Sequence, residues 1–280
     1  ADPFVFPDGG VPAVQKLVGL PFVLHNRWFA PENWYKSRGI PASGWTGGSG
    51  VGMSAALPLD VDFFWNYFFG LQEGYGLKVY EQDFLWTQYD LVPALKRNAT
   101  FADDWLWAMA TAAERHNITI QYCMPYPREY LASTQHPAVR TIRASDDYKP
   151  NNENWRIARQ SLLSHAVGLL PFKDTFLSSG SRQDGAANPG PELTPELHTL
   201  VSTLSGAMVG PGDGPGFANR TRLLQTCMEN GVLLKADRPA VPLDVAWTSN
   251  DPGGELSWSL STLPGGREHR YVLAAALERD

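Results

Sequence analysis

The chain has 280 residues, of which 43% are hydrophobic and 19% charged, a composition that suits one large domain or a domain with a small appendage. Its net charge of −6 and its pI near 5.5, with no basic run to neutralise phosphates, exclude nucleic acid as a partner. No apolar stretch approaches the roughly 18 residues of a membrane span, so none is predicted.

Short apolar segments alternate along the chain with longer segments of helical periodicity. The predicted strands are Phe22–Asn26, Leu77–Gln82, Ile118–Met124, Arg140–Arg143, Leu169–Phe172 and Ala207–Val209. The predicted helices are Asp60–Gly74, Phe101–His116, Pro127–Ser133, Asn154–Gly168, Pro195–Ser205 and Asn219–Asn230. This alternation indicates βαβ units and a mainly parallel sheet.

Polar side chains follow each predicted strand. They lie in the segments His25–Trp28, Glu81–Asp83, Pro125–Tyr126, Ser145–Asp147, Lys173–Asp174 and Gly212–Gly214. Because catalytic side chains of a (β/α)₈ barrel gather at the carboxyl ends of its strands, the pattern favours an α/β fold of that type over a doubly wound sheet.

The strand count is short of the eight that a barrel requires. Phe4–Phe6 is a candidate seventh strand, and the first strand is not recognisable. Three interpretations stay open: a barrel incomplete at its amino-terminal end, a processed piece, or a variant barrel. In the first two, another fragment of the same precursor is a candidate partner.

The pattern changes from Gly231 onward. The strand-like segments Val245–Thr248, Leu256–Leu260 and Tyr271–Leu277 are separated by Gly/Pro turns, which predicts an antiparallel module. We therefore expect a barrel-type domain at 1–230 and the start of a β-sandwich-like module at 231–280.

Two carboxylate groups follow different strands and could act together. Glycoside hydrolysis needs one carboxylic acid to protonate the leaving oxygen and one carboxylate to attack the sugar or activate water, and Asp83 and Asp147 are candidates. Asp146 and Asp147 would point in opposite directions along an extended segment, so only one is expected to face a pocket. The alternatives are an Asx-type turn at Asp146-Asp147 that leads into the helix near Asn154, and a solvated strand end at Glu81 and Asp83.

Other polar and aromatic residues are weaker candidates. Asp174 could contact a substrate or pair with Lys173, and Asp213 could do so or form a tight turn. The chain has ten Trp, ten Tyr and thirteen Phe, and flat aromatic faces such as those of Trp28 and Trp86 suit sugar rings. The sequence has no metal-ligand spacing and no phosphate-binding loop, so neither a metal nor a cofactor is predicted. His25 is expected to be a hydrogen-bonded packing residue rather than a metal ligand.

Three glycosylation acceptor triplets begin at Asn98, Asn117 and Asn219. Together they favour a glycoprotein that is secreted or lumenal.

With these residues in view, the chain resembles the raffinose synthase and seed-imbibition group of glycoside hydrolase family 36, in the α-galactosidase clan of (β/α)₈ barrels. The resemblance rests on Cys123-Met124 followed by the run Arg143–Tyr148, which reads Arg-Ala-Ser-Asp-Asp-Tyr. It continues in Ser205–Met208, Gly212–Gly216, Gly231–Lys235, Arg238-Pro239 and Pro242, and spans roughly residues 75–280.

The resemblance implies a retaining glycosidase or transglycosidase that acts on α-linked sugars and binds carbohydrate. It assigns Asp147 as acid/base, with Arg143 four residues before it. The clan's nucleophile ends a Lys-x-Asp strand, but this chain reads Lys78-Val79-Tyr80, so Asp83 or Glu81 is expected to take that place.

The remaining site residues follow from this assignment. Arg143, Lys78 and Asp146 are expected to bind hydroxyl groups, with Trp28 or Trp86 as a stacking wall. The tyrosine in the nucleophile position leaves an alternative open: a non-catalytic carbohydrate-binding or cell-surface interaction domain on a degenerate barrel.

Overall fold

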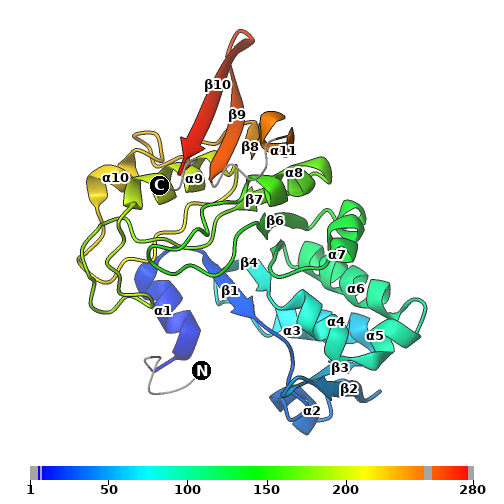
Figure 1. Cartoon of the computed structure of the whole chain (residues 1–280). Coiled ribbons are helices and arrows are strands. Elements are labelled where there is room, and N and C mark those ends of the chain that lie inside the picture. Colours follow the sequence, from blue (N-terminus) through cyan, green and yellow to red (C-terminus); the bar gives the residue numbers. More distant parts are fainter. Residues whose placement is uncertain (1–5, 7, 249–253, 277–280) are drawn as a thin grey trace. The chain divides into compact units, whose positions relative to one another are not determined.

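The computed structural model describes residues 6, 8–248 and 254–276, which form two compact units, Ala1–Arg140 and Thr141–Asp280. Each unit is described by itself (Figure 1). Most of the predicted strand Phe4–Phe6, and the last residue of the predicted strand Tyr271–Leu277, lie outside the described residues.

The first unit contains three parallel strands and their covering helices. In chain order its elements are α1 (Gly10–Val18), β1 (Phe22–Asn26), α2 (Trp34–Ser37), β2 (Trp45–Gly50), β3 (Met53–Pro58), α3 (Val61–Gly70), β4 (Leu77–Gln82), α4 (Leu85–Leu91), α5 (Pro93–Arg97), α6 (Phe101–Arg115), β5 (Thr119–Tyr122), α7 (Pro127–Ala132), the 3₁₀ turn η1 (Ser133–Gln135) and the start of β6 (Val139–Arg143). Strand β4 pairs in parallel with β1 on one side and with β5 on the other. The strands predicted for this region are confirmed, with β1 and β4 at the predicted bounds.

An aromatic cluster holds α3 and α6 against β4. Trp65 of α3 is fully buried and lies 5.6 Å from the Tyr80 ring of β4 and 4.7 Å from the Trp105 ring of α6. The Trp105 indole also donates a hydrogen bond to Gln88 at 2.8 Å. Large buried rings contribute most of the stabilisation of a core, so this cluster fixes the helix layer and the orientation of β4.

The hairpin β2–β3 was not predicted, because Gly47–Gly50 has the composition of a loop. A Cβ on Gly47 would lie 2.6 Å from the carbonyl oxygen of Ala55, so the close approach of the backbones explains glycine inside a strand. Val51 and Gly52 both have positive φ, at 48° and 75°, as the two-residue turn of a hairpin requires.

The second unit joins two parallel strands to an antiparallel sheet. It contains the end of β6, α8 (Ala158–Ala166), β7 (Leu170–Phe172), α9 (Pro195–Leu204), α10 (Arg220–Leu224), β8 (Arg238–Pro242), α11 (Val245–Thr248), β9 (Glu255–Leu263) and β10 (Arg267–Ala275). Strands β6 and β7 are parallel, and the sheet β10-β9-β8 is antiparallel. This confirms two of the three predicted C-terminal strands, Leu256–Leu260 and the described part of Tyr271–Leu277, which lie in the hairpin drawn in orange and red in Figure 1. Strand β8 was not predicted.

One hydrophobic cluster connects the parallel and antiparallel parts of this unit. Ala144, which follows β6, packs with Ile157, Val201 of α9 and Leu273 of β10. The segment after residue 230 therefore shares a core with the strands and helices before it.

Three predictions of secondary structure in this unit are wrong. Val245–Thr248 is the short helix α11, because Ala246 N bonds to the carbonyl of Leu243 and turns the chain after β8. The apolar pattern of so short a segment does not distinguish a helix from a strand.

Ala207–Val209 is not a strand. Val209 packs against the cluster of Tyr148, Phe176 and Leu177, and a single parallel bridge joins Phe176 to Pro211 just after it. The predicted helix Asn219–Asn230 ends at Leu224, because the chain then turns at Gly231, which has a φ of 84°, and pairs Cys227 with Leu233.

Glu255 makes the stability of this unit depend on pH. Its buried carboxylate accepts a hydrogen bond from the first amide of α8, that of Ala158, at 3.2 Å, but burial dominates and raises the pKa of Glu255 to about 7. The folded chain therefore holds a proton that the unfolded chain, with an ordinary pKa near 4.5, releases, so stability is expected to fall as pH rises from about 4.5 to 7. Glu255→Gln is expected to remove this dependence and to raise the free energy of unfolding at pH 8 by at most about 3 kcal/mol.

Urea unfolding of both proteins between pH 4 and pH 8 measures this effect. Glu268→Gln is the matched control, because Glu268 is exposed and forms a surface ion pair with the exposed Arg270. An unchanged pH profile in the Glu255 variant would contradict the assignment.

Candidate active site

A carboxylate and an imidazole meet at the carboxyl ends of β1 and β4. His25 of β1 donates from Nε2 to Oδ2 of Asp83, the first residue after β4, at 2.9 Å. The amide of Phe84 donates to the other oxygen, Oδ1, at 2.6 Å. Asp83 is thus buried with both of its oxygens hydrogen-bonded, and its orientation is fixed. The sequence predicted that His25 is hydrogen-bonded, but no local signal indicated that Asp83 is its partner.

The hydrogen bond to Asp83 raises the pKa of His25, against the opposing effect of burial, and the charge of Glu81 adds to the increase. A raised pKa means that the imidazolium–carboxylate pair stabilises the fold below about pH 6.5 and that this contribution is lost as pH rises through the folded pKa. At neutral pH the His25 ring is therefore protonated in a larger fraction of the molecules than an ordinary histidine would be.

An NMR titration of the histidine ring protons tests this electrostatic coupling. We expect His25 to titrate above 6.5 and Asp83→Asn to move its pKa downward. His136 is the internal control: burial lowers its pKa, and the substitution is expected to leave it unchanged. A His25 pKa that is the same in both proteins would show that the two groups are not coupled.

Strained backbone and aromatic rings surround Asp83. Phe84 has a φ of 54°, in the left-handed region that side chains rarely adopt. Its ring contacts Trp28 edge-on at 5.1 Å and lies under the Arg27 guanidinium at 5.1 Å. Strain of this kind is often found at functional sites. Trp28, a predicted stacking residue, is therefore brought beside Asp83.

Side chains alternate between the two faces of β4, and this alternation explains the structural role of Tyr80. Its ring is buried in the α3 cluster, and its hydroxyl donates to Gln82 at 3.0 Å, so both side chains lie on the helix-covered face. Glu81 lies on the opposite face, where it is paired in register with His25. Tyr80 is thus a core residue, and the carboxylates of this strand end are Glu81 and Asp83.

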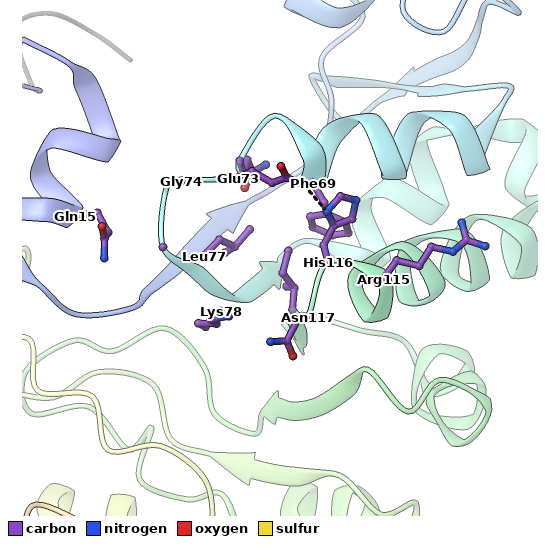
Figure 2. A pocket seen from close by; sticks show the side chains of 12 residues that line it. Gln15, Phe69, Glu73, Gly74, Leu77, Lys78, Arg115, His116 and Asn117 are labelled. Atoms are coloured by element: carbon purple, nitrogen blue, oxygen red, sulfur yellow. Dashed lines mark ion pairs between the residues drawn. The ribbon is translucent and has the colours of Figure 1, made fainter.

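Lys78 is not brought to this site. It lies at the amino end of β4, five strand residues or about 16 Å from Asp83. There it lines a hollow together with Gln15, His116 and Asn117 (Figure 2). Trp86 lies on α4, half-buried and 6.4 Å from the ring of Tyr126.

In the second unit, Arg143 at the end of β6 joins two carboxylates. Its guanidinium lies 2.8 Å from Asp147 and 3.8 Å from Asp174, which follows β7. Asp147 is 67% exposed, and Asp146 is exposed as well. Asp174 accepts a hydrogen bond from the amide of Tyr148 at 2.7 Å. The predicted residues Arg143, Asp147 and Asp174 therefore form one local group.

Beneath this group lies a buried polar network that the sequence did not reveal. The Tyr148 hydroxyl donates to Glu192 at 2.8 Å, and His198 Nε2 lies 3.4 Å from the same carboxylate oxygen. Lys173 is buried 4.9 Å from the Tyr148 ring and donates to the backbone carbonyls of Asp174 and Thr175. Burial lowers the pKa of Lys173 to about 7.

The members of this network are far apart in sequence and come together only through the loops after β6 and β7. Burial also lowers the pKa of His198, as does the nearby charge of Lys173. Burial favours the neutral form of Glu192, but hydrogen bonds from Thr194 and Tyr148 outweigh it and lower the pKa of Glu192. The network therefore anchors the loop that carries Asp147.

Asp213 connects two loops of this unit through hydrogen bonds. Its Oδ1 accepts from Ser178 N at 2.9 Å and from Gln183 at 2.7 Å. These bonds tie the segment before residue 214 to the one after β7.

The predicted glycosylation acceptors lie on turns or helix starts. Asn98 and Asn117 are exposed, and Asn219 caps α10 by accepting from the Arg222 amide at 3.1 Å. The Asn98 side chain accepts from the Thr100 amide at the start of α6.

Within the described residues, no group of three or more His, Cys, Asp or Glu side chains is placed to hold a metal ion. The helices in that part of the chain are all too short or too polar to cross a membrane.

The fold defines a class of proteins: it is the α/β fold of the glycoside hydrolase barrels, and solved structures of that class match 95% or more of the chain. A family 27 β-L-arabinopyranosidase from Geobacillus stearothermophilus has a TM-score of 0.58 and 12% identity, over 95% of this chain and 65% of its own. A variant of the same enzyme in complex with arabinose gives the same values. A protein from Bacillus halodurans, described as a candidate α-N-acetylgalactosaminidase, has a TM-score of 0.54 and 13% identity, over 96% of this chain and 65% of its own.

At 12–13% identity these neighbours show a shared fold alone, and the enzyme whose family is given belongs to family 27, not to family 36. The chain spans about 65% of the length of each. No protein-family model matches the sequence, and no curated protein matches it significantly.

Proposed function

We propose that this protein is a secreted, retaining glycosidase or transglycosidase that acts on α-galactoside-like sugars. The observation that supports it best is that Asp83 directly follows β4 and Asp147 lies four residues after the end of β6, two parallel strands of a fold shared with glycosidases. In such barrels the carboxyl ends of the strands carry the catalytic groups.

In the proposed reaction, Asp83 attacks the anomeric carbon while Asp147 protonates the leaving oxygen. The bond from sugar to leaving group breaks, and an ester forms between the sugar and Asp83. Asp147 then takes a proton from water or an acceptor hydroxyl, whose oxygen attacks the same carbon and releases Asp83. Glu81 is the alternative nucleophile on the same strand end.

The neighbouring residues have supporting roles in this proposal. His25 orients the Asp83 carboxylate and stabilises its ionised form. Arg143 holds Asp147, and Asp174 and Asp146 accept hydrogen bonds from sugar hydroxyls. The ring of Trp28 beside Phe84 offers a stacking face. Lys78 has no part in it.

The test is hydrolysis of nitrophenyl α-D-galactopyranoside, and of the β-L-arabinopyranoside, by the wild-type protein and by Asp83→Asn. Turnover that is lost in the variant, with release of a sugar of unchanged anomeric configuration by NMR, is the expected result. Release of the inverted anomer would overturn the retaining mechanism, and full activity of Asp83→Asn would overturn the assignment of the nucleophile.

One observation favours a second candidate function, a carbohydrate-binding domain without catalysis. Asp147 is 67% exposed, whereas the acid of a glycosidase usually lies in a dry environment that keeps it protonated. Binding of galactose by the wild-type protein with no turnover of either substrate would support this alternative.

A further inference from the structure

The outer face of α6 carries an unusual tryptophan. Helix α6 buries Trp105 and Met109 on one side and exposes acidic residues on the other. Trp107 lies on that polar face and is 54% exposed, with Asp103 and Asp104 one turn before it. Because residues three and four apart share a helix face, the indole and the two carboxylates lie side by side.

Trp107 borders a hollow of about 410 Å³ between α6 and the segment formed by α7 and η1. The opposite wall contains Leu131, which is 63% exposed, together with Gln135 and His136. A hollow of this size is within the range of small-molecule sites. Its lining combines apolar surface with hydrogen-bonding groups.

A second observation that points to a ligand in this hollow concerns His136. Only 5% of the residue is exposed, so its ring is held in place by the surrounding side chains. The ring meets the Trp107 indole edge-on at 5.5 Å and lines the hollow. Burial lowers the pKa of His136, so at neutral pH the ring offers one donor and one acceptor.

The charges of the hollow favour a neutral ligand. Arg128 is already paired with Asp103 at 2.8 Å and with Glu129 at 2.7 Å, so it is not available to an anion. Asp104 accepts from the Thr100 hydroxyl at 2.8 Å with one of its oxygens. What is left is an aromatic face bordered by carboxylate, amide and imidazole groups, which matches the apolar face and hydroxyl rim of a sugar ring.

We propose that the hollow between α6 and α7 is a binding site for a neutral saccharide. Trp107 supplies the stacking face, and His136, Gln135 and Asp104 bond to its hydroxyl groups. The site is built from helices of the first unit alone and does not depend on Asp83 or Asp147. It would hold a sugar chain without cleaving it.

Titration with raffinose, monitored through the indole N–H signals of the ¹⁵N-labelled protein, tests this site. The Trp107 signal is identified by its absence in Trp107→Phe. We expect it to shift on titration, in the wild type and equally in Asp83→Asn. Trp107→Ala is expected to weaken raffinose binding at this site about tenfold, read from the backbone signals of α7.

Trp34→Ala is the matched control, because Trp34 is 49% exposed in the same unit and stacks only on Arg38 and Tyr35 among its ring contacts in the described residues. It is expected to leave binding unchanged. No shift of Trp107, an equal loss in both alanine variants, or a shift produced by tetramethylammonium but not by raffinose would each overturn the proposal.

Discussion

Asparagine in place of Asp147 is expected to lower kcat/KM by about 10² to 10⁴-fold for a galactoside whose leaving group is another sugar, and by far less for the nitrophenyl galactoside. A sugar hydroxyl needs a proton as it leaves, whereas nitrophenolate leaves without one. The measurement is the ratio of the two kcat/KM values in the wild type and the variant. This ratio separates a general acid from a residue that merely supports the fold, which would affect both substrates alike.

Two further variants make the result specific. Asp83→Asn is expected to lower turnover of both substrates together, because a nucleophile is needed whatever the leaving group. Asp146→Asn is the matched control, since Asp146 is exposed beside Asp147 and is expected to retain the wild-type ratio. If Asp146→Asn rather than Asp147→Asn changed the ratio, the acid would have to be reassigned to Asp146.

Aspartate in place of Tyr80 is expected to destabilise the first unit by more than 4 kcal/mol and not to raise activity. The substitution recreates the Lys-x-Asp pattern of the clan, but the side chain points into the aromatic cluster of α3, where Trp65 and Phe69 surround it. It removes a buried ring, which typically costs about 3–5 kcal/mol, and it adds a carboxylate without a partner.

Urea denaturation followed by circular dichroism measures the loss. Tyr80→Phe is the control: it keeps the ring and removes only the hydrogen bond to Gln82, at a cost of about 1 kcal/mol. A Tyr80→Asp protein as stable as Tyr80→Phe would contradict the core role of Tyr80, and a gain of glycosidase activity would show that position 80 is the nucleophile position.

Strand positions were the most predictable part of the fold. The segments Phe22–Asn26 and Leu77–Gln82 are short, apolar and bounded by turn residues, so local pattern and pairing agree. Where local pattern and packing disagreed, the element was either missed or predicted wrongly. Gly47–Gly50 forms a strand because glycine lets two backbones approach closely, and Val245–Thr248 turns into a helix after β8.

The candidate site also has one part that could be predicted from the sequence and one part that could not. The Arg143–Asp147 pair could be predicted, because four residues of chain keep the two side chains within reach of one another. The match of Lys78-Val79-Tyr80 to the clan's pattern could not be resolved from spacing alone. Only the direction of the Tyr80 side chain shows that this position belongs to the core, since a strand gives alternate residues to opposite faces.

The sequence by itself determined the α/β class, the parallel strands of the first unit and the carboxylates that follow them, because these depend on periodicity and on neighbours along the chain. Only the tertiary structure decided which residues of the site contact one another. His25 meets Asp83 across 58 residues, and Tyr148 meets Glu192 across 44. Contacts at such separations are set by strand register and by loop packing, which leave no local mark in the sequence.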